Sequence, residues 1–150
     1  DIAAYVVERF RQTGRDVGDA LNPLLDAARG HPKQAMLLAH RLWEEVDAGD
    51  TGGFAEWEAA HEAALAELDA EFDAQWRGFD TSEQKTMRSV LDGGGSPYRA
   101  DVLRRLSLSK DMVRKALPRL LATAEIEAVD GKYVLVDPLF AEWIRRALEA

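Results

Sequence analysis

Three consecutive glycines at 93–95 are the part of this sequence closest to a phosphate-binding loop. Such a loop cradles phosphates with backbone N–H groups, and a following Gly-Lys-Ser/Thr holds the terminal phosphate and Mg²⁺. Here the run continues as Ser96-Pro97, without that lysine. We therefore interpret residues 93–97 as a structural loop, because Gly and Pro interrupt regular elements.

Residues for metal binding or covalent catalysis are also missing from the sequence. His31, His40 and His61 are too scattered for a helical i, i+4 zinc pair, and no Gly-x-Ser-x-Gly nucleophile elbow occurs. The carboxylates fall on the polar faces of predicted helices, where solvation is their ordinary role. We predict that the chain is not an enzyme, has no catalytic residues and binds neither a metal nor a cofactor of its own.

The charge pattern divides the 150 residues into two halves. Residues 1–79 hold 7 Lys and Arg against 16 Asp and Glu, a net charge of −9, whereas residues 80–150 hold 12 against 11, or +1. We therefore expect two domains, 1–79 and 80–150. Because the chain has no cysteine, no signal peptide and no run of about 20 apolar residues, we expect a cytoplasmic protein without a membrane partner.

Apolar residues at helical spacing predict four helices in the N-terminal half, connected by short turns as in a four-helix bundle. Gly14, Gly30 and the Gly-rich stretch 49–53 separate them, and Pro23 either kinks the second helix or delays its start. The predicted inward residues are Ile2, Val6, Val7 and Phe10; Leu21, Leu24 and Leu25; Ala35, Leu38, Leu42, Trp43 and Val46; and Phe54, Trp57, His61, Ala64, Leu65, Leu68, Phe72 and Trp76.

The C-terminal half has the pattern of a winged helix. Thr81 and Gln84 fit a capping box for a first helix, a short second helix follows residues 93–97, and Ser109 is a suitable N-cap for a third. A short helix, a tight turn and another helix form a helix-turn-helix. The predicted inward residues of these helices are Met87, Val90, Leu91, Ala100, Leu103, Leu106, Val113, Leu117, Leu120 and Leu121.

A two-stranded wing and one more helix complete this half. Asp130-Gly131 joins the extended segments 125–129 and 132–136, and this dipeptide favours a two-residue hairpin turn. Asp137-Pro138 then begins the last helix, with Leu139, Phe140, Trp143, Ile144 and Leu148 on its apolar face. The fold class we predict is therefore mainly α, a four-helix lid-type bundle followed by a winged helix-turn-helix.

Several of these segments together resemble the C-terminal lid and winged helix of prokaryotic AAA+/STAND-type ATPases, the archaeal-ATPase-like group. The residues that carry the resemblance are Tyr5…Phe10, Gly30-His31-Pro32-Lys33, Leu37 to Trp43, Phe79-Asp80, Gly94 to Tyr98, Leu108-Ser109-Lys110 and Tyr133 to Leu139. The resemblance implies a missing N-terminal ATPase core, which would bind ATP or ADP, ahead of Asp1. It also implies a regulatory role, with a protein partner or duplex DNA on the winged helix.

In this family a Gly-x-Pro turn at the third lid helix lies against the nucleotide, so the resemblance implies that Gly30, His31, Pro32 and Lys33 face it. The alternative is that Gly30 ends one helix and Pro32 starts the next. One departure concerns the wing, where such modules usually have a Gly and this chain has Ala124-Glu125. We therefore expect the wing to begin differently.

Basic residues of the third winged-helix segment suggest a second function, a DNA-binding transcriptional regulator module. Such a helix enters the major groove, and a wing residue reaches a phosphate. Asp101 and Asp111 dilute the charge, however, and Pro118 interrupts the helix. The sequence therefore allows two functions, a regulatory region of an ATPase and a DNA-binding module. The candidate DNA contacts are Lys110, Arg114, Lys115, Arg119 and Lys132.

Overall fold

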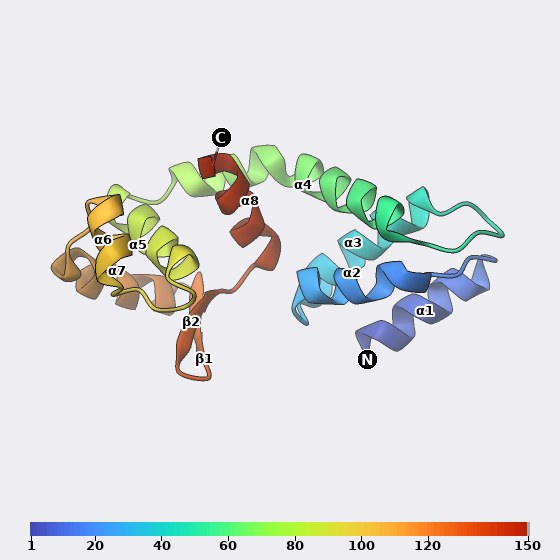
Figure 1. Cartoon of the computed structure of the whole chain (residues 1–150), viewed down its shortest axis with the longest axis horizontal. Coiled ribbons are helices and arrows are strands. Elements are labelled where there is room, and N and C mark those ends of the chain that lie inside the picture. Colours follow the sequence, from blue (N-terminus) through green and yellow to red (C-terminus); the bar gives the residue numbers. More distant parts are fainter. Residues whose placement is uncertain (150) are drawn as a thin grey trace. The chain divides into compact units, whose positions relative to one another are not determined.

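The computed structural model describes residues 1–149. Over this range the chain is mainly helical, with eight α-helices, one 3-10 turn and one two-stranded antiparallel sheet (Figure 1). This confirms the predicted fold class at the level of secondary structure. Two compact units share the chain: unit 1 is Asp1–Asp69, and unit 2 begins at Ala70. The division falls inside the fourth helix, whereas the charge pattern places a boundary after it.

Helix α1 (Ile2–Gln12) of unit 1 begins at an acidic cap, since the Asp1 carboxylate accepts the N–H of Ala3 at 2.9 Å. Val6 and Phe10, one turn apart, are buried. The prediction that Val7 faces inward is wrong, because this side chain is 41% exposed. Adjacent helical residues point about 100° apart, so the neighbouring helices that cover Val6 leave Val7 in solvent.

The second predicted helix, 17–28, is a 3-10 turn at Gly18–Ala20 followed by α2 (Leu21–Ala28). Pro23 lies in the first turn of α2, where its missing N–H costs no intrahelical hydrogen bond, so it marks the start of the helix rather than a kink. Helix α3 (Pro32–Glu45) begins at Pro32 as predicted and buries Ala35, Leu38 and Leu42. Helices α1, α2 and α3 contact one another pairwise.

Two loops of unit 1 are joined by backbone hydrogen bonds. The N–H of Gly49 donates to the carbonyl of Gly14 at 2.7 Å, and the N–H of Gly52 donates to that of Asp16 at 2.8 Å. Glycine is required at position 52, because a Cβ there would lie 2.6 Å from the carbonyl oxygen of Val17. These contacts fix the ends of α1 and α3 next to each other.

The longest helix, α4 (Phe54–Arg77), contributes residues to both units. In unit 1 it buries Trp57, Ala60, Ala64 and Leu65. The prediction that Phe54 begins the buried stripe is wrong, since Phe54 is 67% exposed. Among residues 1–149, no helix combines the length and apolar character that crossing a bilayer requires.

An aromatic cluster joins the last turns of α4 to helix α8 (Pro138–Glu149) in unit 2. The ring of Phe140 lies 5.1 Å from Phe72 and 6.0 Å from Trp143, centroid to centroid. Trp76 and Phe79 lie 6.4 Å and 6.5 Å from the same ring. Phe140 is 2% exposed and is therefore the centre of this part of the core.

Helix α5 (Thr81–Asp92) has a capping box, but one residue earlier than predicted. The Asp80 carboxylate accepts the N–H of Glu83 at 2.8 Å, and the Glu83 carboxylate accepts the N–H of Asp80 at 3.0 Å. The prediction of Thr81 and Gln84 is wrong because Asp is at least as good an N-cap as Thr and stands one position ahead. The side-chain amide of Gln84 instead donates to the carbonyl of Trp76 at 2.8 Å.

Helices α6 (Ala100–Leu106) and α7 (Lys110–Ala122) follow as predicted and both contact α5. Ser109 caps α7, its hydroxyl accepting the N–H of Met112 at 3.1 Å. The helix continues through Pro118, so this proline does not end it. Leu121 was expected inside, but this prediction is wrong: its side chain is 37% exposed, near the end of α7.

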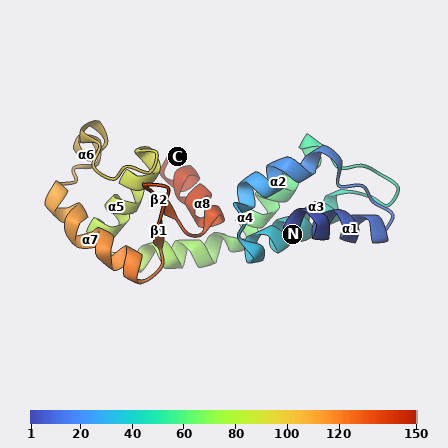
Figure 2. The same cartoon turned by 90° about the horizontal axis from the view of Figure 1, so that it is seen from below.

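Strands β1 (Ile126–Val129) and β2 (Lys132–Leu135) form the hairpin, with Ile126 opposite Leu135 and Val129 opposite Lys132. Asp130 and Gly131 both have positive φ, 51° and 77°, as the predicted two-residue turn requires. The hairpin contacts α5, α7 and α8, which surround it in Figure 2.

Gly95 links the hairpin to the loop after α5. Its carbonyl accepts the N–H of Tyr133 at 2.9 Å. A Cβ at this position would lie 2.9 Å from the Cβ of Lys132, so only glycine permits the approach. The Gly-rich run at residues 93–95 therefore has a structural role in unit 2, because it lets the loop after α5 pack closely against the hairpin.

Candidate functional site

The turn between α2 and α3 holds the four residues that the family resemblance places against a nucleotide. Gly30, with φ 71°, Pro32 and Lys33 are exposed, and His31 is half-buried. His31 caps α3, its Nδ1 accepting the N–H of Gln34 at 3.5 Å. Helix ends therefore account for Gly30, His31 and Pro32, while Lys33 forms no ion pair with the described side chains.

The basic face of unit 2 consists of Lys110, Arg114, Lys115 and Arg119 on α7, all exposed. Three of these cations face carboxylates of the same unit. Asp111 lies 3.2 Å from the Lys115 ammonium and 4.0 Å from the Arg114 guanidinium, and Arg119 lies 3.4 Å from Asp80. Intramolecular pairs thus neutralise much of the charge that the sequence suggests for phosphate binding.

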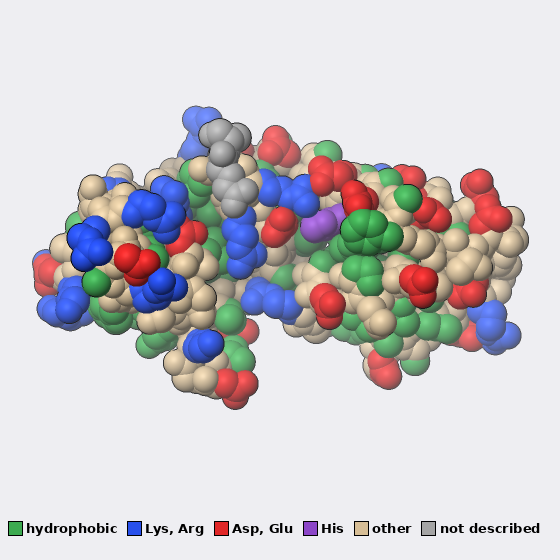
Figure 3. Space-filling model, in the orientation of Figure 1, with side chains coloured by type: hydrophobic (Ala, Val, Ile, Leu, Met, Phe, Trp, Pro, Cys, Tyr) green, Lys and Arg blue, Asp and Glu red, His purple; other side chains and the backbone are tan. Residues whose placement is uncertain are grey.

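Two of the candidate DNA contacts form no ion pair with the side chains described for residues 1–148. Lys110 at the start of α7 and Lys132 in the hairpin are both exposed. Arg104 on α6, which the sequence analysis does not single out, is also exposed and forms no ion pair in this range. On the face seen in Figure 3, Lys and Arg side chains gather over unit 2, and Asp and Glu side chains over unit 1.

The three histidines each have a local contact. His31 caps α3, the Nε2 of His40 lies 2.8 Å from a Glu44 carboxylate oxygen, and the ring of His61 stacks on Trp57 at 5.0 Å. No group of three or more His, Asp and Glu side chains within residues 1–148 is arranged to hold a metal ion.

Glu125 lies at the start of the hairpin and is half-buried. Burial raises the pKa of this carboxyl, the nearby carboxylates of Asp137 and Glu83 add to the rise, and a hydrogen bond from Gln75 opposes it. The Gln75 Nε2 donates to Oε2 of Glu125 at 3.3 Å. Glu125 lies in the connection between α7 and β1, so its contacts belong to the packing of unit 2.

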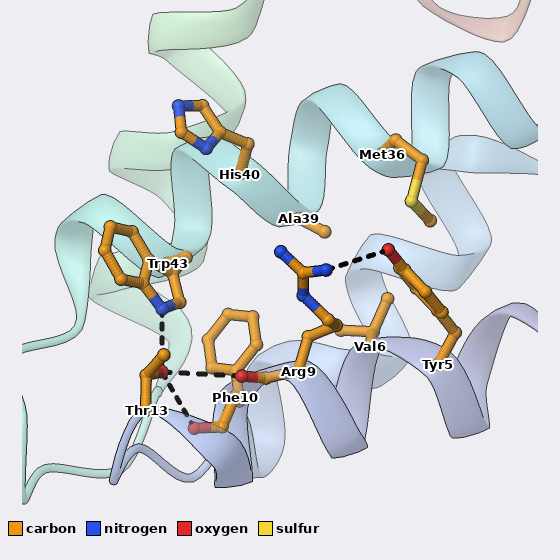
Figure 4. A pocket seen from close by; sticks show the side chains of 9 residues that line it. All are labelled: Tyr5, Val6, Arg9, Phe10, Thr13, Met36, Ala39, His40 and Trp43. Carbon is orange, nitrogen blue, oxygen red and sulfur yellow. Dashed lines mark hydrogen bonds between the residues drawn. The ribbon is translucent and has the colours of Figure 1, made fainter.

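A pocket of about 310 Å³ lies between α1 and α3 in unit 1. Five of its residues come from α1 and its C-cap, and four come from α3 (Figure 4). Helical spacing alone does not predict this pocket, although residues 36, 40 and 43 share one face of α3. The lining residues are Tyr5, Val6, Arg9, Phe10, Thr13, Met36, Ala39, His40 and Trp43.

Polar contacts fix one end of this pocket. The indole Nε1–H of Trp43 donates to the Thr13 hydroxyl at 2.9 Å, and that hydroxyl donates to the Phe10 carbonyl at 3.0 Å. The Arg15 guanidinium lies 4.0 Å from the Trp43 ring centroid. The indole is therefore held in one orientation by a hydrogen bond and a cation–π contact.

The structure thus brings together the four residues of the α2–α3 turn and, separately, the four cations of α7. It also adds an aromatic pocket that sequence patterns do not reveal. No protein-family model, curated protein or solved structure matches this chain.

Proposed function

We propose that this chain is the non-catalytic C-terminal region of an AAA+/STAND-like ATPase. In this proposal unit 1 is the lid that closes on a nucleotide held by a separate core. Unit 2 is a winged helix that carries the nucleotide state to a protein partner. Such coupling requires that the lid and the partner contact one state of the core better than the other.

The main support for the proposal is the order of the elements in unit 2, together with the hydrogen bond that joins its hairpin to the loop after α5. Helices α5, α6 and α7, the hairpin and α8 follow in the order of a winged helix. The hydrogen bond from Tyr133 to Gly95 attaches the loop after α5 to the edge of β2, as a short third strand would. The Asp130-Gly131 turn and the Ser109 cap support the same assignment, because a helix-turn-helix with a wing uses a hairpin turn and a capped second helix.

The α2–α3 turn supports the lid part of the proposal. Pro32 presents a flat apolar ring and Lys33 a cation beside it, and both are exposed. A purine base and a phosphate offer the complementary surfaces. Because the turn alone provides one cation and no phosphate loop, the chain should bind free nucleotide only weakly.

Ion pairs on α7 favour a protein partner for unit 2. Specific DNA binding draws heavily on phosphate neutralisation by Lys and Arg. Here Arg114 and Lys115 share Asp111, and Arg119 lies near Asp80. A phosphate would have to compete with these carboxylates, whereas a protein surface of mixed charge can use both signs.

A DNA-binding regulator module is the second candidate. Lys110 and Lys132 favour it, because each is exposed and forms no ion pair among the described residues. They lie at the start of α7 and in the wing, the two places where a winged helix meets a duplex. The salt dependence of duplex binding separates the two candidates.

Nucleotide titration followed by amide NMR spectra tests the lid proposal on the chain as it is. We expect Mg-ATP to shift the amide resonances of Gly30, His31 and Lys33, with a dissociation constant weaker than about 1 mM and without phosphate release. Lys33→Gln should reduce these shifts, and Arg11→Gln, an exposed change on α1, should leave them intact. Micromolar ATP binding, or shifts that leave out residues 30–33, would contradict the proposal.

A further inference from the structure

The pocket between α1 and α3 is a binding site of a different kind from the nucleotide-facing turn. We propose that it takes a small planar aromatic carboxylate, with the ring against the aromatic wall and the carboxylate on Arg9. This proposal is independent of the ATPase assignment, because it uses only the walls of the pocket in unit 1. Figure 4 shows the Arg9 guanidinium between Tyr5 and Trp43, directed toward α3.

Arg9 supplies a cation with no carboxylate partner among the described residues. Its guanidinium donates to the Tyr5 hydroxyl at 3.3 Å and lies 5.7 Å from the centroid of that ring. The acidic neighbour Glu8 is paired with Arg11 at 2.9 Å. A planar guanidinium binds a carboxylate through two parallel hydrogen bonds. The carboxylate of an anionic ligand would therefore supply the partner that Arg9 lacks.

The other charged groups around the pocket leave this role to Arg9. His40 is held by Glu44 at 2.8 Å. Arg15 donates to the carbonyl of Val46 at 2.5 Å and lies over the Trp43 ring. The pocket therefore has one available positive charge. Apart from Thr13 and His40, whose polar groups already have partners, the rest of its lining is aromatic and apolar.

The walls fit a flat ring. Tyr5 and Met36 are 49% and 36% exposed, large apolar side chains that solvent reaches from opposite helices. Trp43 adds aromatic surface, and Met36 can adjust its shape to a ligand. A volume of about 310 Å³ is at the small end for ligand pockets, which favours one or two fused rings over a nucleotide.

The test is an NMR titration of the intact chain with 2-naphthoate and with its neutral analogue 2-naphthamide. We expect both to shift the indole N–H resonance of Trp43, which the structure places on Thr13, together with amides of α1 and α3. Naphthoate should bind about fivefold more tightly, the contribution of one partly exposed charged pair.

Variants assign this preference to the pocket. Arg9→Gln should remove it while leaving naphthamide binding unchanged. Arg77→Gln, an exposed change on α4 outside the pocket, should preserve it. Met36→Glu places a negative charge at an exposed wall and should weaken naphthoate binding by about fivefold or more. Amide spectra of each variant report whether unit 1 remains folded.

Equal affinity for the two ligands, or a preference for naphthoate that survives Arg9→Gln, would overturn the proposal. Absence of any saturable shift of the Trp43 indole would overturn it as well. None of these outcomes bears on the nucleotide titration of residues 30–33, so the two proposals fail separately.

Discussion

Ala124 is the residue whose backbone conformation gives the sharpest stability prediction. It joins α7 to β1 with φ 59°, in the left-handed region that favours glycine. The hairpin therefore follows a left-handed residue, although the sequence has alanine where winged helices of the resembled family usually have glycine. We predict that Ala124→Gly stabilises unit 2.

The magnitude follows from two opposing terms. A left-handed conformation costs a non-glycine residue about 1–2 kcal/mol, which glycine recovers. Glycine loses more conformational entropy on folding, about 0.5–1 kcal/mol. The Ala124 side chain is exposed, so its removal costs no packing. The net stabilisation is about 0.5–1 kcal/mol, or roughly 1–4 °C in Tm for a chain of this size.

Calorimetric unfolding of the full chain measures this change, and Ala122→Gly is the matched control. Ala122 is an exposed residue at the end of α7, where glycine loses helix propensity and should destabilise by about 0.5–1 kcal/mol. The two substitutions have the same chemistry and opposite expected signs. Equal destabilisation by both would refute the left-handed assignment at residue 124.

Three further predictions concern unit 2. Gly95→Ala should destabilise by about 2–4 kcal/mol in denaturant unfolding, because strain at φ 96° adds to a weakened hydrogen bond to Tyr133; a loss under 0.5 kcal/mol would contradict the close approach. The stability that the raised pKa of Glu125 implies is complete below its ordinary pKa of 4.5 and declines as pH rises through the folded-state pKa. Glu125→Gln should therefore raise Tm at pH 7 relative to the parent, with the gap closing in acid; an equal gap at both pH values would disagree. Phe140→Ala should cost about 3–5 kcal/mol, and the exposed Phe54→Ala under 1 kcal/mol; equal losses would contradict the aromatic core.

Much of the secondary structure follows from the spacing of hydrophobic residues and from the residues that cap helices or form turns. Pro32 at the start of α3, Ser109 at the start of α7 and Asp130-Gly131 in the hairpin each act on neighbouring backbone groups, so sequence predicts them well. The error at the α5 cap is of the same local kind. Both Asp80 and Thr81 can cap, and hydrophobic spacing does not decide between adjacent positions.

Burial is less predictable, because it depends on where neighbouring elements end. Val7, Phe54 and Leu121 continue apolar helical patterns, yet each points beyond the helices that cover its neighbours. The pocket cannot be predicted for the same reason: Tyr5 and Trp43 are distant in sequence and line a common pocket only when α1 packs on α3.

Residue spacing along a helix predicts only some of the ion pairs on α7. Asp111 and Lys115 form an i, i+4 pair that helical spacing predicts, whereas Asp80 reaches Arg119 from the N-cap of α5. The candidate DNA-binding face therefore appears more cationic in sequence than in the folded unit. This difference decides which partner we propose for unit 2.

Anisotropy of a labelled random-sequence DNA duplex tests that central claim most directly, at about 20 mM and about 150 mM salt. We predict no binding at the higher salt and only weak binding at the lower. Asp111→Asn, which releases Arg114 and Lys115, should strengthen the low-salt binding. Micromolar binding by the parent chain at the higher salt would contradict a protein-directed winged helix, provided that it is lost when Lys110, Arg114 and Lys115 become Gln. The control variant has Arg11, Lys33 and Arg77 changed to Gln, which removes the same total charge away from α7. Binding that this control keeps and the α7 variant loses would assign the DNA contact to α7.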